Sequence, residues 1–149
     1  MELSNKKRTT TIKRSFNLTM VLMVLITLFF VWIENNVGAL ISGGLLVFSI
    51  IVVQFVNINY VYYSSEGSKV MIRYYPVIAF FGKEYNSIEF DKSLLYFVKI
   101  KRYMAFSDLY LAVKTSKGIA EYPEVSLVGL TKSEIQLIEN DLNSLMKNR

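Results

Sequence analysis

The sequence contains no cysteine and no histidine among its 149 residues. Without cysteine the chain has no disulfide, no thiol nucleophile and no thiolate ligand for zinc. Without histidine it lacks the side chain that most often transfers protons near neutral pH. These absences disfavour several classes of enzyme, and they leave the redox compartment of the protein undetermined.

The acidic residues and the glycines form no recognisable catalytic motif. The carboxylates show no paired spacing for acid–base chemistry, and the glycines lie where turns are expected instead of in a phosphate-binding loop. The residues concerned are Asp91, Asp108, Glu121 and Glu124, and Gly67, Gly82 and Gly118. We therefore expect a protein without catalytic activity, cofactor, metal or small-molecule substrate.

Charge is missing from two long stretches near the N-terminus. Phe16–Ile33 and Val37–Ile58 contain no charged residue, and only Glu34-Asn35-Asn36 separates them. About 20 apolar residues suffice for a helix to cross a membrane, so the pattern predicts transmembrane helices at 16–33 and 37–58 that pack as an antiparallel hairpin. The alternative for the first stretch, a cleaved signal peptide, is disfavoured because Val37-Gly38-Ala39 is a poor cleavage site.

The basic residues concentrate before the first apolar stretch. Residues 1–15 carry five Lys and Arg against the single acid Glu2, and this accounts for +4 of the net charge of +5. Lysine and arginine beside a membrane helix favour the cytoplasmic side. The cluster therefore predicts a multi-pass protein of the cytoplasmic (inner) cell membrane with both termini in the cytoplasm, and not a nucleic-acid-binding arm.

Small residues occur at close spacing in the second apolar stretch. Gly38 and Ser42, and likewise Ala39 and Gly43, are four residues apart and let helix backbones approach closely. Such a face can pack against the first helix of the same chain or against another subunit.

From residue 59 onward the pattern changes to short alternating runs that are typical of β-strands. The predicted strands are Lys69–Tyr75, Val77–Phe81, Ser87–Phe90, Leu94–Tyr103, Asp108–Thr115 and Ile119–Tyr122, within a total of about seven. Tyrosines 60, 62 and 63 follow the second apolar stretch, where aromatic rings favour the membrane–water interface.

The last predicted element is an amphipathic helix over residues 131–147. Thr131 and Glu134 have the spacing of a capping box, and Leu130 and Ile135 supply a hydrophobic staple. An apolar stripe that includes Ile138 follows at helical spacing. We expect this helix to cover the open end of the β domain.

The combination of about seven antiparallel strands and one C-terminal amphipathic helix, from Asn57 to Arg149, resembles a bacterial pleckstrin-homology-like (PH-like) domain. The segment Tyr122–Leu127 that leads into the helix is similar to the final strand and loop of small membrane-anchored proteins of this kind. The resemblance implies an antiparallel barrel or sandwich. It brings no lipid site with it, because the turn Ser64–Ser68 contains Glu66 and has only Lys69 at its edge.

The sequence therefore predicts three segments, namely a basic N-terminus (1–15), a transmembrane hairpin (16–58) and a cytoplasmic PH-like domain (59–149). We expect an accessory subunit that docks a membrane-protein partner or a second copy, next to the lipid bilayer. The alternative is recognition of anionic lipid headgroups. Either contact would use the basic residues of the domain, namely Lys69, Arg73, Lys83, Lys99, Lys101 and Arg102.

Overall fold

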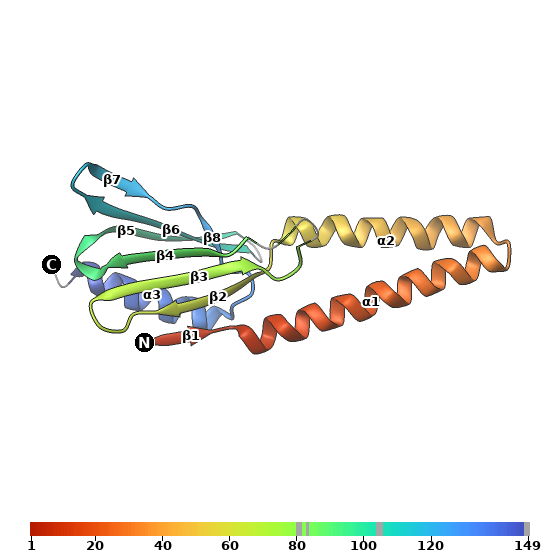
Figure 1. Ribbon diagram of the computed structural model, residues 1–149, viewed down its shortest axis with the longest axis horizontal. Coiled ribbons are helices and arrows are strands. Elements are labelled where there is room, and N and C mark those ends of the chain that lie inside the picture. The colour runs from red at the N-terminus through yellow and green to blue at the C-terminus, as the bar shows by residue number, and fades with distance from the viewer. Residues whose placement is uncertain (80–81, 83, 104–105, 148–149) are drawn as a thin grey trace.

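In the computed structural model, a long helical hairpin projects from one end of a β domain (Figure 1). The structure describes residues 1–79, 82, 84–103 and 106–147. The strands of the domain run in the same general direction as the two helices, so the molecule is elongated (Figure 1).

The hairpin consists of α1 (Lys6–Trp32) and α2 (Asn36–Val56), and both helices are long and apolar enough to cross a membrane. Helix α1 begins ten residues before the predicted start at Phe16, so its first turns are basic and polar. The side chain of Asn35 accepts a hydrogen bond from the backbone N–H of Gly38 at 2.9 Å and thereby caps α2.

The first antiparallel sheet, sheet A, has the order β1-β2-β3-β4. Its strands are β1 (Glu2–Ser4), β2 (Asn59–Ser64), β3 (Lys69–Pro76) and β4 (Asn86–Asp91). The sequence reading set residues 1–15 apart as an N-terminal segment, whereas the structure divides them between β1 and α1. Their alternation is too short to predict a strand, and β1 forms only because β2 offers it an edge.

The second antiparallel sheet, sheet B, has the order β5-β6-β7, with β8 pairing to β6. A short 3-10 helix, η1 (Lys92–Leu94), leads into it. Its strands are β5 (Leu95–Tyr103), β6 (Phe106–Thr115), β7 (Gly118–Glu121) and β8 (Val125–Ser126). Across the described residues the two sheets form no closed barrel. The part of the predicted fold that is confirmed is the α+β arrangement, with two antiparallel sheets and a C-terminal helix.

The predicted strand Val77–Phe81 differs from the structure. Residues 77–79 follow Pro76 without strand pairing, and residues 80–81 lie outside the described part of the chain. The Val77 N–H still donates to the Ile58 carbonyl at 2.9 Å, but β2 begins only at Asn59, so residues 78–79 have no strand edge to pair with.

The core lies between the two sheets and is covered by α3 (Lys132–Lys147). Alternating residues of β2, β3, β4 and β6 point into it, and α3 adds Ile135, Ile138 and Leu142. The predicted capping box is present, because the Glu134 carboxylate accepts from the Thr131 backbone N–H at 2.6 Å and the Thr131 hydroxyl accepts from the Glu134 N–H at 3.3 Å.

One of the predicted interface tyrosines belongs to the core instead. Tyr63 is fully buried, and its hydroxyl donates a hydrogen bond to Asp141 of α3 at 2.6 Å. Burial, followed by the neighbouring Asp141 carboxylate, raises the pKa of Tyr63 above its ordinary value. The inward position follows from β alternation, which places Val61 and Tyr63 on the same face of β2.

Candidate functional site

The junction between the hairpin and the β domain is closely packed and buried. Asn5, which is 2% exposed, donates a side-chain hydrogen bond to the Asn59 carbonyl at 3.0 Å and accepts one from the Val61 N–H at 2.9 Å. A Cβ atom at Gly129 would lie 2.6 Å from the Asn59 carbonyl oxygen and 2.7 Å from Nδ2 of Asn5. The start of the chain, β2 and the loop before α3 therefore meet with no space for a side chain.

An ion pair extends this junction to α3. The Arg8 guanidinium contacts the Glu134 carboxylate at 2.7 Å and donates to the Gly129 carbonyl at 3.1 Å. Burial acts to raise the pKa of Glu134, but hydrogen bonds from Arg8 and Thr131 outweigh it and hold that pKa below its ordinary value. Helix α1 is thus tied to both sheet A and α3, which fixes the orientation of the domain on the hairpin.

The predicted contact residues on sheet A lie on β3, apart from Lys83, which falls outside the described residues. Lys69 is exposed and forms an ion pair with Glu89 of β4 at 2.9 Å. Arg73 is also exposed and stands opposite Tyr62 on β2 and Ser87 on β4.

The other predicted contact residues lie on β5 in sheet B. Lys99 and Lys101 are on its outer face, and the Lys101 ammonium stands 4.4 Å above the ring centre of Tyr110. Arg102 points the other way and pairs with Glu139 of α3. The structure therefore distributes the predicted residues over two sheets and does not bring them into a single basic cluster.

The outer face of sheet B contains a hollow of about 250 Å³ next to these lysines. Phe97 lines it and is 45% exposed, while Tyr110 donates a hydrogen bond to the Glu124 carboxylate. Burial, and then the charge of Glu124, raise the pKa of Asp108 on the same face. We define this surface, made by Phe97, Lys99, Lys101 and Tyr110, as the sheet B face.

The sequence reading did not single out Phe97, although alternation with Lys99 and Lys101 would have placed it on the same face. A bulge between Leu95 and Phe97 shifts the register of β5 by one residue, so alternation counted from Leu95 would turn Phe97 inward. Counting back from Lys99 and Lys101 therefore gives the observed side of Phe97, whereas counting forward from Leu95 does not, because the bulge lies between them.

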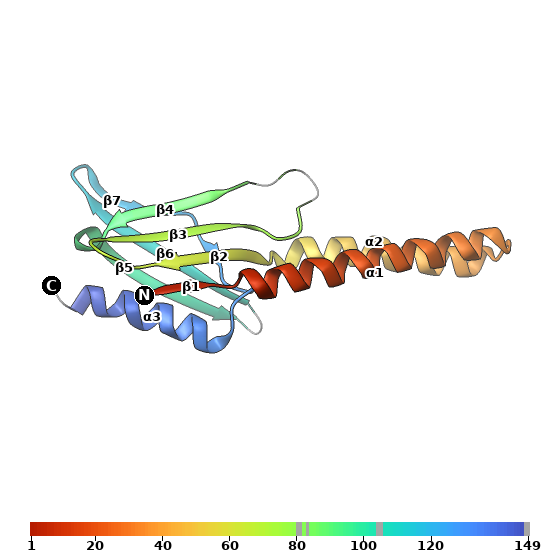
Figure 2. The same ribbon diagram turned by 60° about the horizontal axis from the view of Figure 1, so that its bottom comes forward.

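Further exposed aromatic residues lie where strands meet the hairpin end of the domain. The last residue of β5, Tyr103, is 77% exposed, and the first residue of β6, Phe106, is exposed as well. Both strand ends lie at the hairpin end of the domain (Figure 2). Tyr85, just before β4, is also exposed at this end. Aromatic rings in such a position suit a membrane–water interface.

The small residues of α2 face α1 in the structure. A Cβ atom at Gly38 would lie 2.5 Å from the Phe30 ring, and one at Gly43 would lie 3.8 Å from Thr27. Ala39 is half-buried, and the Ser42 hydroxyl donates to the Gly38 carbonyl at 2.8 Å. The close approach therefore occurs within the chain, at the end of the hairpin away from the β domain.

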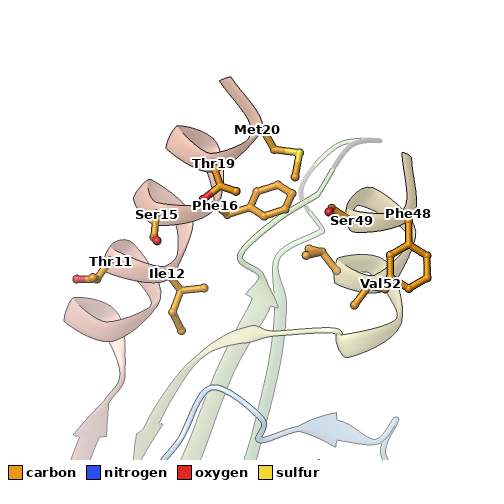
Figure 3. Close-up of a pocket in the computed structure, with 10 residues that line it drawn as sticks. Thr11, Ile12, Ser15, Phe16, Thr19, Met20, Phe48, Ser49 and Val52 are labelled. Atoms are coloured by element: carbon orange, nitrogen blue, oxygen red, sulfur yellow. The ribbon is translucent and has the colours of Figure 1, made fainter. Parts of the chain in front are cut away.

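At the domain end the two helices separate and leave a groove of about 570 Å³ (Figure 3). Its lining is mainly apolar, with Phe16 and Met20 from α1 and Phe48 and Val52 from α2. Hydroxyl groups of α1, including Ser15, stand at its edge (Figure 3). In a bilayer such a groove is filled by acyl chains or by another helix.

Within the described residues, no group of three or more Asp and Glu side chains could hold a metal ion. No known protein family, curated protein or solved structure shows a significant match to this chain.

Proposed function

We propose that this protein is a non-catalytic accessory subunit whose transmembrane hairpin holds a PH-like domain at the cytoplasmic membrane, where the sheet B face docks a membrane-protein partner. The observation that carries the proposal is the direction of that face. The strands run along the helices, so the faces of the sheets stand upright on a membrane that the hairpin crosses (Figure 1). Lys99 and Lys101 then point sideways along the membrane surface, towards neighbouring proteins.

The composition of the sheet B face supports a protein partner. Protein interfaces are enriched in aromatic side chains, and Phe97 and Tyr110 stand among lysines and carboxylates that can set specificity. The closely packed junction also supports a protein partner, because a domain held rigidly on its hairpin loses little conformational entropy when it binds a neighbour.

The PH-like assignment rests on the two antiparallel sheets and the single C-terminal helix that covers the core between them. The cytoplasmic orientation rests on the basic first turns of α1, because positive charge beside a membrane helix favours that side. The junction brings β1 and β2 together, so the N-terminus and the domain share one side of the membrane in this proposal.

Lipid recognition by the six predicted basic residues is the weaker alternative. Lys69 and Arg102 are already paired with carboxylates, and Lys99 and Lys101 point along the membrane surface, not towards the headgroups, in the orientation above. Attraction of about 1 kcal/mol per basic residue requires the charge to lie close to the headgroups.

Site-specific photocrosslinking in intact cells tests the docking surface. A photoreactive phenylalanine analogue at Phe97 should give a discrete protein adduct, whereas the same analogue at Ser87, exposed on sheet A, should not. Lys99→Glu combined with Lys101→Glu should abolish the adduct without lowering the melting temperature.

The matched control is Lys117→Glu with Lys132→Glu, which changes two exposed lysines elsewhere and should leave the adduct unchanged. Equal adducts from the analogue at Phe97 and at Ser87 would contradict the proposal. So would an adduct that persists when Lys99 and Lys101 are both replaced by glutamate.

A further inference from the structure

Two adjoining hollows lie between the first turns of α1 and the outer face of sheet A. The larger is about 380 Å³ and the smaller about 240 Å³, and both are lined by Tyr60 and Tyr75. These two rings stack with their centres 4.6 Å apart, and Tyr85 continues the cluster at 5.0 Å from Tyr75. The shared wall is therefore a surface of tyrosine rings at the hairpin end of the domain.

Three basic side chains from two elements surround these rings. Lys6 and Arg73 line the larger hollow, and Lys13 lines the smaller one. None of the three takes part in an ion pair within the described part of the chain, where Arg8, Lys69 and Arg102 each have a carboxylate partner. The charge of these three residues is therefore available to an anion from outside the chain.

The two acidic residues of β4 are positioned away from this site, whereas the other acid of the sheet, Glu2 of β1, hydrogen-bonds to Tyr62, which stands opposite Arg73. On β4, Glu89 stands opposite Met71 and Asp91 opposite Lys69, towards the start of β3, whereas Arg73 lies nearer its membrane-side end. The outer face of sheet A is consequently acidic at the far end and basic beside the hairpin, which favours an anion at the membrane side.

The membrane-side end of the site is at the depth of the headgroup layer. Lys13 precedes Phe16, the first residue of the uncharged stretch, by three positions, or about 4.5 Å along the helix, and Lys6 lies about 15 Å from Phe16. Each headgroup layer is roughly 5–8 Å thick outside a hydrocarbon core of about 30 Å. Lys13 therefore reaches lipid phosphates. Lys6 and Arg73, which line the same hollow, start beyond the headgroup layer, and their long side chains extend back towards it.

From this geometry we propose that Lys6, Lys13 and Arg73 bind one anionic phospholipid of the cytoplasmic leaflet. The phosphate contacts Lys13, and the outer part of the headgroup lies over Tyr60 and Tyr75 between Lys6 and Arg73. This site is separate from the sheet B face and shares only Arg73 with the six basic residues predicted from the sequence. It would couple the junction of hairpin and domain to the lipid around it.

Lipid binding to the purified full-length protein in neutral detergent tests the site. Phosphatidylglycerol and phosphatidylcholine are titrated separately, with binding followed by native mass spectrometry and by the rise in melting temperature that a ligand of the folded state produces. We expect one phosphatidylglycerol per chain, bound at least about tenfold more tightly than phosphatidylcholine, since about 1 kcal/mol per basic residue is available. Lys6→Gln, Lys13→Gln and Arg73→Gln together should remove this preference.

The matched control removes three lysines from sheet B through Lys99→Gln, Lys101→Gln and Lys114→Gln, and it should bind phosphatidylglycerol within about twofold of the unchanged protein. If the first triple variant does not fold, Lys13→Gln alone should weaken binding several-fold and serves as the test. Equal binding of both lipids, or equal loss in the two triple variants, would overturn the proposal. Inorganic phosphate that competes as strongly as the lipid would overturn it too, since the site would then bind a free anion.

Discussion

At Gly129 the chain leaves no room for even one methyl group, since a Cβ atom would meet the Asn59 carbonyl oxygen at 2.6 Å. Gly129→Ala should therefore destabilise the junction by about 1–3 kcal/mol, the usual cost of overpacking a well-packed site. Thermal unfolding followed by circular dichroism in detergent should show a melting temperature lower by several degrees. Gly44→Ala in α2 is the control, because nothing lies within 4 Å of a Cβ there, and it should not lower the melting temperature, since alanine is favoured over glycine in a helix by up to about 1 kcal/mol. Equal melting of the two variants would show that the junction is loose.

At Glu134 the prediction concerns pH. The pKa of this carboxyl is lowered in the folded protein, so the charged form contributes stability that is complete above its ordinary pKa of 4.5 and is lost as pH falls through the lowered value. Melting temperature should fall more steeply below about pH 4.5 in the unchanged protein than in Glu134→Gln. Glu66→Gln, in the exposed turn after β2, should follow the unchanged protein. Parallel pH profiles for Glu134→Gln and the unchanged protein would contradict the ion pair with Arg8.

Gly129 and Glu134 also show which single-residue contacts can be predicted from the sequence. The capping box of Glu134 is local, so its spacing to Thr131 predicted it correctly. Its second partner, Arg8, is 126 positions away, and no local pattern indicates such a contact. Asn5 and Gly129 meet for the same reason, through chain topology, and neither could be singled out before the fold was known.

Among the elements, α3 provides the sharpest contrast between neighbouring residues. Ile138 is 1% exposed, whereas Leu137, the preceding residue, is 52% exposed. Ile138→Asp should unfold the β domain because it buries a charge without a partner, and Leu137→Asp should leave the melting temperature nearly unchanged. Circular dichroism and the resistance of the domain to limited proteolysis measure both. If Ile138→Asp melts like Leu137→Asp, α3 is not packed on the core.

The strands were predicted well where alternation is long and where turns mark the ends, as in β3, β5 and β6. Prediction failed for β1, which has three residues and depends on pairing with β2. It also placed a strand at residues 77–79, where an apolar run continues after Pro76 without pairing. In both cases the deciding factor is whether a sheet edge is available, and this information lies elsewhere in the chain.

For the whole molecule, the sequence predicted two membrane-length helices followed by an antiparallel β domain with a C-terminal helix. It left a barrel and a sandwich open, and it did not indicate which strands form each of the two four-stranded sheets, since residue patterns do not specify which strand edges pair. It likewise gave the basic contact residues without showing that the five described ones lie on different sheets, Lys69 and Arg73 on β3 and the other three on β5. The upright orientation of the sheet B face appears only when the strands are seen beside the hairpin.

Cysteine accessibility tests the central claim, that the hairpin crosses the membrane and holds both the N-terminus and the β domain on the cytoplasmic side. Single cysteines at Ser4 in β1, at Asn36 at the start of α2 and at Ser116 in the β6–β7 turn replace exposed residues in a chain with no cysteine of its own. In sealed cells an impermeant thiol reagent should label only Asn36→Cys, and after permeabilisation it should label all three. Labelling of Ser4→Cys or Ser116→Cys in sealed cells, or a failure to label Asn36→Cys there, would contradict this topology.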